Sequence, residues 1–289
     1  MRPPHPISAP SQPVAPASTP NGVTLALSPR PFISVEHLHK QYGQGAPILS
    51  DVSLAIAAGD FISLIGPSGC GKSTLLKLVA GLIPVSQGTI NVDGMTPGNA
   101  RELMSFIFQD ATLLPWRNVI GNVELGLELE ASLDASRRAE KANDLIRLVG
   151  LTHVARHYPR QLSGGMKMRV SIARALATRP RLLLMDEPFG ALDEMTRDRL
   201  NEEILRLRSE QGWTALFVTH SVAEAVFLST RVVVMQANPG RIRREIPIPF
   251  PFPRTEALRS DPAFLSLVGD VSHALRELNG ALPGKESHP

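Results

Sequence analysis

The segment LIGPSGCGKST, residues 64–74, decides the fold. It matches the pattern G-x-x-x-x-G-K-[ST], follows the apolar run FISLI, and opens a segment, residues 72–82, that is typical of a helix. Glycines let backbone N–H groups curl around phosphate oxygens, and the helix N-terminus adds partial positive charge. We therefore predict a nucleotide-binding loop in which Lys72 reaches the β and γ phosphates and the Ser73 hydroxyl binds Mg²⁺. The candidate nucleotide-binding residues of this loop are Gly66, Pro67, Ser68, Gly69, Cys70, Gly71, Lys72, Ser73 and Thr74.

Composition limits the class of protein. Cys70 is the single cysteine, so an internal disulfide is excluded and a reducing compartment is the expectation. Its place in the loop has two interpretations, a small side chain required by packing or a reactive thiol at a helix N-terminus.

A net charge of +3 only weakly favours anionic partners. No apolar run approaches the roughly 18–20 residues that span a bilayer, and the N-terminus has no apolar signal region. We expect an intracellular protein.

The chain divides into three parts by composition. Residues 1–31 form a proline-rich arm, with seven prolines in the first 20 positions. Between residues 32 and 245, apolar strands alternate with helices, which predicts an α/β fold with a mostly parallel sheet covered on both faces. Residues 111–178 lack strand signals and form an inserted helical lobe. Residues 246–289 are a C-terminal extension, whose alternate prolines exclude a central strand and which ends with a short amphipathic helix.

Two acids follow the apolar strand RLLLM. Asp186 and Glu187 stand at the carboxyl end of this strand, where an α/β sheet presents side chains to its ligand. Asp186 is the candidate ligand of Mg²⁺, and Glu187 is the candidate general base that polarises the attacking water. Pro188 disfavours the helical region for Glu187 and is expected to keep it extended. The alternative is that one acid only caps the next helix.

Two further polar residues end neighbouring strands. His220 follows TALFVT and precedes Ser221-x-x-Glu224, which is the pattern of a capping box. A histidine here can hydrogen-bond the γ phosphate or the attacking water. Gln109 ends SFIFQ in the same way, and its amide can reach Mg²⁺ and water. Taken alone, each also fits an ordinary surface position.

The segment LSGGM, residues 162–166, starts a helix with two glycines, which weaken a helix by roughly 0.8–1 kcal/mol each. Lys167 and Arg169 then place positive charge at the positive end of the helix dipole. Ser163 fits a helix cap whose hydroxyl can instead face a phosphate. These features indicate an anion site built at some cost in helix stability.

Taken together, these motifs resemble the nucleotide-binding subunits of ABC transporters over about residues 32–245. The resemblance implies a P-loop ATPase fold with an antiparallel N-terminal β part, and it implies ATP and Mg²⁺ as ligands. It identifies LLLMDE as Walker B, Gln109 as the Q-loop, and His220 as the H-loop. It further assigns Tyr42 to stacking on adenine, with a surface tyrosine as the alternative. Finally, it implies that a second copy binds head to tail, so that Ser163, Gly164 and Gly165 close on the ATP of the other subunit. It also assigns Met166 of the signature and Asp193 of the D-loop to nucleotide binding.

Four segments narrow the resemblance to importers of the nitrate, sulfonate and taurine group, which includes importers of thiamine-precursor pyrimidines. They are FQDATLLPWRNVIGNVELGLE, LSGGMKMR, MDEPFGALDE and VVVMQANPGRI. The signature has Met166 where LSGGQ is common, and Met168 where Gln is frequent. This resemblance implies ATP hydrolysis on the inner face of the cell membrane, together with a membrane permease and an extracytoplasmic solute-binding protein.

The segment LLPW has two interpretations. Leu113, Leu114 and Trp116 either form local core or contact the permease, and Pro115 prevents a continuous helix through them. The alternative function is that of a soluble ABC ATPase acting on nucleic acid or ribosomes. Such proteins usually have long coiled-coil insertions or two cassettes in one chain. The single phosphate loop here disfavours this class, and no nucleic-acid partner is expected.

Overall fold

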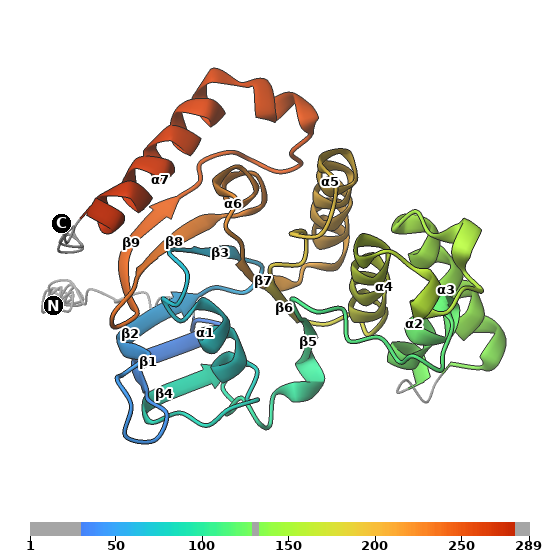
Figure 1. The fold of residues 1–289 in the computed structure, drawn as a ribbon, viewed down its shortest axis with the longest axis horizontal. Coiled ribbons are helices and arrows are strands. Elements are labelled where there is room, and N and C mark those ends of the chain that lie inside the picture. The colour runs from blue at the N-terminus through green and yellow to red at the C-terminus, as the bar shows by residue number, and fades with distance from the viewer. Residues whose placement is uncertain (1–29, 129–132, 281–289) are drawn as a thin grey trace, which may run out of the picture. The chain divides into compact units, whose positions relative to one another are not determined.

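The computed structural model describes residues 30–128 and 133–280. The proline-rich arm predicted over residues 1–31 therefore lies outside the described residues except for Arg30 and Pro31, as does the end of the chain after Gly280. The described part contains two sheets, a lobe of helices and a C-terminal helix (Figure 1).

The main sheet has six strands in the order β5-β6-β7-β3-β8-β9. Its first five strands are parallel, and β9 runs antiparallel to β8 at one edge. All residues of β3, β6 and β7 are buried, as expected for the centre of a parallel sheet. The strands are β3 (Phe61–Ile65), β5 (Met104–Ile107), β6 (Leu182–Asp186), β7 (Thr214–Val218), β8 (Arg231–Gln236) and β9 (Arg241–Pro247). Pro247 ends the edge strand, where a missing N–H is tolerated.

Side chains of the main sheet alternate between two hydrophobic cores. In β3, Phe61 and Ile65 face one core, whereas Ile62 and Leu64 face the other. The second core also contains helix α1 (Lys72–Val79) and the three-stranded antiparallel sheet β2-β1-β4. That sheet consists of β1 (Ile33–Lys40), β2 (Leu49–Ile56) and β4 (Gln87–Val92).

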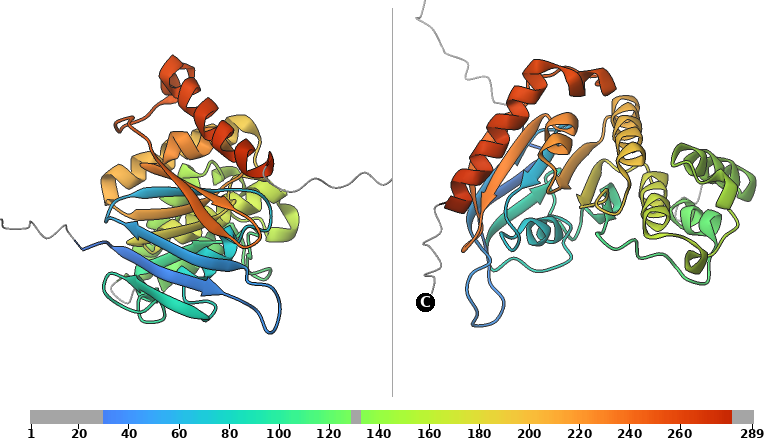
Figure 2. Two further views of the ribbon diagram at one scale, coloured as in Figure 1. Left: turned by 90° about the vertical axis from the view of Figure 1, so that its left-hand side faces the viewer. Right: turned by 45° about the horizontal axis from the view of Figure 1, so that its top comes forward.

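The first core continues into the remaining helices, and Figure 2 shows the arrangement of these helices in two further views. Three of them pack on one another within residues 111–178 and form the lobe: α2 (Val119–Glu128), α3 (Ala135–Leu148) and α4 (Gly164–Ala177). The others are α5 (Glu194–Gln211), α6 (Val222–Leu228) and α7 (Pro262–Gly280). Within the described ranges, four short 3₁₀ turns span Arg101–Leu103, Thr152–Val154, Pro159–Gln161 and Glu256–Ser260.

A buried arginine ties the C-terminal extension to the end of α6. The Arg254 guanidinium donates hydrogen bonds to the carbonyl oxygens of Phe227 at 2.7 Å and Ser229 at 2.9 Å. The guanidinium groups of Arg254 and Arg208 lie 4.0 and 4.4 Å from the ring centre of Phe252. Burial, reinforced by Arg208, lowers the pKa of Arg254 to about 10, so it stays charged at neutral pH. The extension is thus anchored by charge-assisted bonds to carbonyls that the helix end leaves free.

Candidate functional site

The phosphate loop connects β3 to α1. Gly66, Gly69 and Gly71 have φ angles of 157°, 77° and 91°, a region that side-chain-bearing residues rarely adopt. Gly71 is the N-cap of α1 in the left-handed conformation. Gly66 has no room for a Cβ atom because the carbonyl oxygen of Met235 lies against it. Glycine is therefore required here both for conformation and for close approach.

Lys72 folds back over this loop. Its ammonium donates to the carbonyl oxygens of Gly66 at 2.8 Å and Pro67 at 3.1 Å, and it lies 3.7 Å from the Cys70 sulfur. The Cys70 side chain is fully buried, and this burial raises the pKa of its thiol above the ordinary value. A raised pKa favours the neutral thiol, so the geometry supports the small-side-chain interpretation of Cys70 over the reactive one.

Ser73 and Asp186 meet although they are 113 positions apart in the sequence. The Ser73 hydroxyl donates to Asp186 Oδ1 at 2.8 Å, and Asp186 is only 5% exposed. Burial is the main cause that raises the pKa of Asp186, with a smaller contribution from Glu187. Hydroxyl and carboxylate oxygens are ligands that Mg²⁺ accepts, so these residues fit that ion. The described residues contain no cluster of three His, Cys, Asp or Glu that would form a complete metal cage.

Replacing Asp186 by Asn should stabilise the ligand-free chain while it disables hydrolysis. Because the folded state raises the pKa of Asp186, stability is greatest when the carboxyl is protonated and falls as pH rises through its folded pKa. Asn keeps an acceptor oxygen for Ser73 and removes the buried charge. We expect the Tm near pH 8 to rise by about 2–4 °C, the shift for about 1 kcal/mol in a chain of this size.

Thermal unfolding at pH 5 and pH 8 measures this effect. The gain of Asp186→Asn should be smaller at pH 5 than at pH 8, because the raised pKa of Asp186 means that lowering the pH moves the wild-type carboxyl toward its neutral form. Asp110→Asn, a change at an exposed acid, is the control and should leave Tm unchanged at both pH values. If Asp186→Asn had a lower Tm than the wild type at pH 8, the charge of Asp186 would not destabilise the folded chain, and the prediction would be contradicted.

Glu187 and His220 face each other at the ends of β6 and β7. Glu187 Oε2 lies 3.5 Å from His220 Nδ1, and His220 is largely exposed. The expectation that Glu187 is extended is wrong, because its φ is 49°. Its N–H still bonds to Val218 O, but its carbonyl turns to accept from Gly190 N, so the chain reverses here. Such backbone strain at a polar residue is typical of functional sites.

The buried carboxylate of Glu224 contacts the residue that precedes His220. The Ser221 hydroxyl accepts from Glu224 N at 3.3 Å, as a capping box requires. The reciprocal half of the predicted box is wrong, because the Glu224 carboxylate accepts from the Thr219 hydroxyl at 2.6 Å and pairs with Arg197 at 3.4 Å. Glu224 thus joins the residue before His220 to helix α5. Burial raises the pKa of Glu224.

Gln109 and Tyr42 are both exposed. Strand β5 ends at Ile107, so Gln109 stands two positions beyond the strand rather than at its end. Tyr42 follows β1 and is 51% exposed, with the Lys40 ammonium 4.6 Å from its ring centre. An open ring face on a loop is available to a flat ligand, although a surface tyrosine has the same geometry.

The segment LSGGM lies at the start of α4. Ser163 caps this helix by accepting from Met166 N at 3.2 Å, and Gly164 is exposed with no atom near its Cβ position. Asp193 caps α5 through Thr196 N at 2.9 Å, and this hydrogen bond is the main cause that lowers the pKa of Asp193. Figures 1 and 2 place α4 among the lobe helices, with β5 and β6 between it and α1. The signature therefore lies apart from the phosphate loop of its own chain.

The chain was compared with known proteins. The sequence pattern of the family described as ABC transporter matches residues 49–190. The taurine import ATP-binding protein TauB of Escherichia coli O157:H7 is 42% identical over 244 residues, which cover 82% of this chain and 94% of TauB. The chain belongs to the ABC transporter family. A putative ATP-binding protein of Brucella abortus is 43% identical over 259 residues, 90% of this chain and 99% of that protein.

Solved structures agree with this family. A dimeric post-hydrolysis structure of the ATP-binding cassette MJ0796 with ADP and Pi matches with a TM-score of 0.71 and 31% identity, over 75% of this chain and 99% of that one. This confirms the predicted ABC ATPase fold. The chain is an ATP-hydrolysing subunit of the importer type, and the alternative of an ATPase acting on nucleic acid or ribosomes is not favoured. None of the helices in the described ranges has the length and apolar character needed to cross a bilayer.

Within this ABC protein, the structure brings together two pairs of predicted residues, Ser73 with Asp186 and Glu187 with His220. Sequence reasoning missed the role of Glu224. The available signal was an acid within the apolar segment VAEAVFLS, where a charge demands a buried partner.

Proposed function

We propose that two copies of this chain bind two ATP molecules head to tail and couple hydrolysis to solute uptake through a separate membrane permease. The observation that carries the proposal is the meeting of the Ser73–Asp186 and Glu187–His220 pairs at the carboxyl ends of neighbouring strands, beside the phosphate loop. That edge of the sheet is where α/β folds bind ligands. The exposed signature supplies the surface that closes on the second copy.

Hydrolysis is an in-line attack by water on the γ phosphate. Glu187 orients this water and accepts its proton, while His220, 3.5 Å away, holds the carboxylate and faces the γ phosphate. Lys72 leaves the loop carbonyls that it now contacts and binds the β and γ phosphates. Tyr42 stacks on adenine, and Gln109 lies near the attacking water. Mg²⁺, held by Ser73, Asp186 and Gln109, would neutralise charge on the phosphates.

The second copy completes each site. Ser163, Gly164 and Gly165 offer a hydroxyl and backbone N–H groups at the positive end of α4, which fits a γ phosphate. Met166 and Asp193 stand beside them at the same surface. Support comes from the separation of α4 from its own phosphate loop, which leaves these groups without an anion from the same chain. Closure and opening of the pair would move the permease.

The permease contact is proposed at the start of the lobe. Leu113 packs against the lobe core, and Leu114 N donates to the Asn122 side chain at 2.8 Å. Trp116, in contrast, is 71% exposed. The local-core interpretation of LLPW therefore fits Leu113. The permease-contact interpretation fits Trp116, whose side chain is exposed to solvent and accessible to a partner. A large aromatic residue held on a fixed turn is typical of interface anchors.

Replacing Trp116 by Ala should weaken assembly and leave folding intact. Its exposed ring contributes little to stability, so the free energy of unfolding should change by less than about 0.5 kcal/mol. Loss of an interface tryptophan costs about 2 kcal/mol or more, which is at least tenfold in permease affinity. Leu265→Ala, at a 56% exposed leucine on α7, is the control. A large fall in Tm for Trp116→Ala would favour the local-core interpretation.

The solute is proposed to be a small sulfonate, nitrate, or a thiamine-precursor pyrimidine, and similarity to TauB favours a sulfonate such as taurine. The chain would act in the cytoplasm as a peripheral protein on the inner face of the membrane, with an extracytoplasmic binding protein delivering the solute. The test is ATP hydrolysis by the assembled complex in vesicles across this panel. One solute should stimulate hydrolysis several-fold when its binding protein is present. The proposal would be contradicted if the rate of ATP hydrolysis did not change when the permease, the binding protein or any of the solutes was added.

A further inference from the structure

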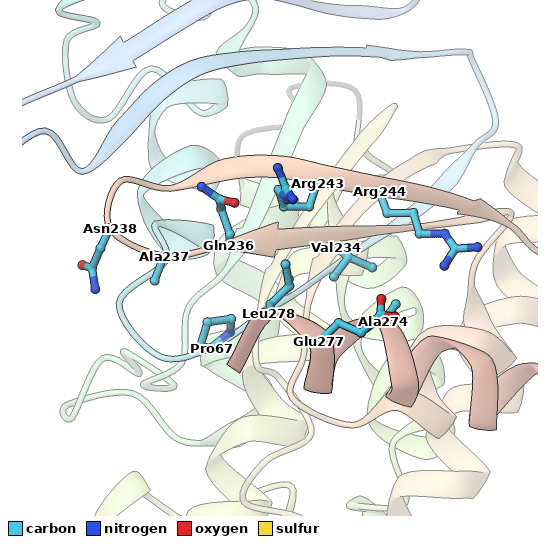
Figure 3. A pocket seen from close by; sticks show the side chains of 10 residues that line it. All are labelled: Pro67, Val234, Gln236, Ala237, Asn238, Arg243, Arg244, Ala274, Glu277 and Leu278. Atoms are coloured by element: carbon cyan, nitrogen blue, oxygen red, sulfur yellow. The ribbon is translucent and has the colours of Figure 1, made fainter. Parts of the chain in front are cut away.

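The cavity between the β8–β9 hairpin and helix α7 is lined by charged groups that do not converge (Figure 3). Arg243 and Arg244 point apart along β9, and Glu277 of α7 is in the same lining. The charged groups around Glu224 differ, because Glu224 is buried and is in direct contact with its partners. These contacts connect the turn that carries His220 to helix α5.

Hydrogen bonds of Glu224 hold both neighbours of His220. The Thr219 hydroxyl donates to Glu224 Oε2 at 2.6 Å and accepts from Ser221 N at 3.0 Å. Glu224 N donates to the Ser221 hydroxyl at 3.3 Å. The Glu224 side chain is only 7% exposed, which strengthens its electrostatic interactions relative to those in water. The backbone on either side of His220 is thus fixed to Glu224, while the His220 side chain itself stays largely exposed.

Arg197 connects Glu224 to the segment that follows Glu187. Arg197 Nε lies 3.4 Å from Glu224 Oε1, and Arg197 Nη2 donates to the carbonyl oxygen of Leu192 at 2.8 Å. Between Glu187 and Leu192 the chain turns through a hydrogen bond from Gly190 N to Glu187 O at 3.3 Å. The ion pair therefore joins the turn described above to the segment that begins at the candidate base.

Arg197 is the cation in contact with Glu224. Arg259 of the C-terminal extension also influences Glu224, but its Nη2 lies 2.9 Å from Asp198 Oδ1. Burial raises the pKa of Glu224, whereas the hydrogen bond from Thr219 and the charge of Arg197 oppose that rise. Removal of Arg197 therefore weakens the charged form of Glu224 as well as the connection to α5.

We propose that Glu224 and Arg197 are positioning residues that hold His220 at Glu187. Glu224 fixes the turn at His220, and Arg197 fixes that turn to the segment after Glu187. Within the described residues, no hydrogen bond or ion pair of either residue involves the phosphate loop. A displacement of about 1 Å at a catalytic group can cost about 10² in rate. The proposal rests on the catalytic roles proposed above for Glu187 and His220.

Steady-state hydrolysis by Glu224→Gln, Arg197→Met and the double variant tests the positioning. Gln keeps an oxygen that accepts from Thr219 but cannot pair with Arg197. We expect kcat to fall at least tenfold in each variant while KM for ATP stays within twofold of wild type. Because the two residues act as one pair, the double variant should lose no more than either single variant. A kcat within twofold of wild type for Glu224→Gln, or losses that multiply in the double variant, would overturn the proposal.

Two features keep this test decisive. The double variant leaves no unpaired buried charge, so it keeps the fold if a single variant does not. Glu203→Gln and Arg206→Met are the matched controls, because these residues also form an ion pair on α5, at 2.9 Å, but are more exposed than Glu224. Both controls should retain the kcat and KM of the wild type.

Two substitutions at Thr219 test the hydrogen bonds without changing a charge. Thr219→Ser keeps the hydroxyl that bonds to Ser221 N and Glu224, whereas Thr219→Val has nearly the same volume and loses both bonds. The kcat should stay within twofold of wild type for Thr219→Ser and fall at least tenfold for Thr219→Val, with ADP affinity unchanged in both. Equal turnover by these two variants would contradict the proposal.

Hydrogen exchange separates the position of His220 from its part in hydrolysis. In the full, nucleotide-free chain, the amides of Ser221 and Glu224 should exchange at least tenfold faster in Thr219→Val and in Glu224→Gln than in the wild type. Unchanged exchange in variants that have lost turnover would overturn the positioning. Wild-type turnover by His220→Ala would instead overturn the catalytic role of His220, and exchange alone then decides whether Glu224 and Arg197 position it.

Discussion

Glu187→Gln is expected to lower steady-state ATP hydrolysis by about 10²–10⁴-fold, the usual contribution of a general base. The Gln side chain has the same shape but its amide cannot accept the proton of the attacking water. Glu187 is half-buried beside His220 and does not contact the phosphate loop through any hydrogen bond within the described residues. ATP should therefore bind the variant with wild-type affinity.

Two measurements separate chemistry from binding for this variant. Steady-state turnover gives the loss of rate, and equilibrium titration with a fluorescent ATP analogue gives the affinity. Glu256→Gln, a change at an exposed acid of the C-terminal extension, is the control and should retain both. Turnover within twofold of wild type would remove Glu187 from the role of base.

Gly164→Tyr is expected to abolish ATP-dependent dimer formation and to reduce turnover about 10²-fold or more, because the N–H groups aimed at the phosphate can no longer approach it. The single chain should tolerate the change, since no atom lies within 4 Å of the Cβ position at Gly164 and its φ is not in the left-handed region. ATP binding by the monomer should be retained.

Gly269 provides a matched control for this substitution. It also lies in a helix, α7, with no atom within 4 Å of its Cβ position. Gly269→Tyr should therefore dimerise and hydrolyse ATP as the wild type does. Gly165 is unsuitable, because a Cβ there would lie 3.0 Å from Ala191 O and disturb the monomer itself. Normal turnover by Gly164→Tyr would exclude the signature from the ATP site.

Local patterns predicted those parts of the fold that local forces determine. The strand, loop and helix around residues 61–79 follow from an apolar run, glycines and a helix start that are adjacent in the sequence. The fully apolar β6 and β7 likewise indicated a central parallel sheet. The sites at their carboxyl ends followed because parallel strands bring those ends to one edge.

Features that depend on contacts between residues far apart in the chain could not be predicted from the sequence. The conformation of Glu187 results from hydrogen bonds to Val218 and Gly190, and the Glu224 carboxylate turns away from its own helix start to meet Arg197 on another helix. The β-bulge at Arg243 follows from the pairing of β9 with β8, in which Val234 pairs with Arg244 and Met235 with Ile242. Neither the spacing nor the type of these residues encodes such contacts.

The central claim is that each ATP is shared between two copies of the chain. Light scattering of Glu187→Gln with ATP and Mg²⁺ tests it most directly, because slow hydrolysis preserves the closed state. The account predicts twice the single-chain mass of 31.3 kDa with ATP, the single mass with ADP, and the single mass with ATP when Gly164→Tyr is added. A single-chain mass for Glu187→Gln at saturating ATP, or a dimer unaffected by Gly164→Tyr, would contradict it.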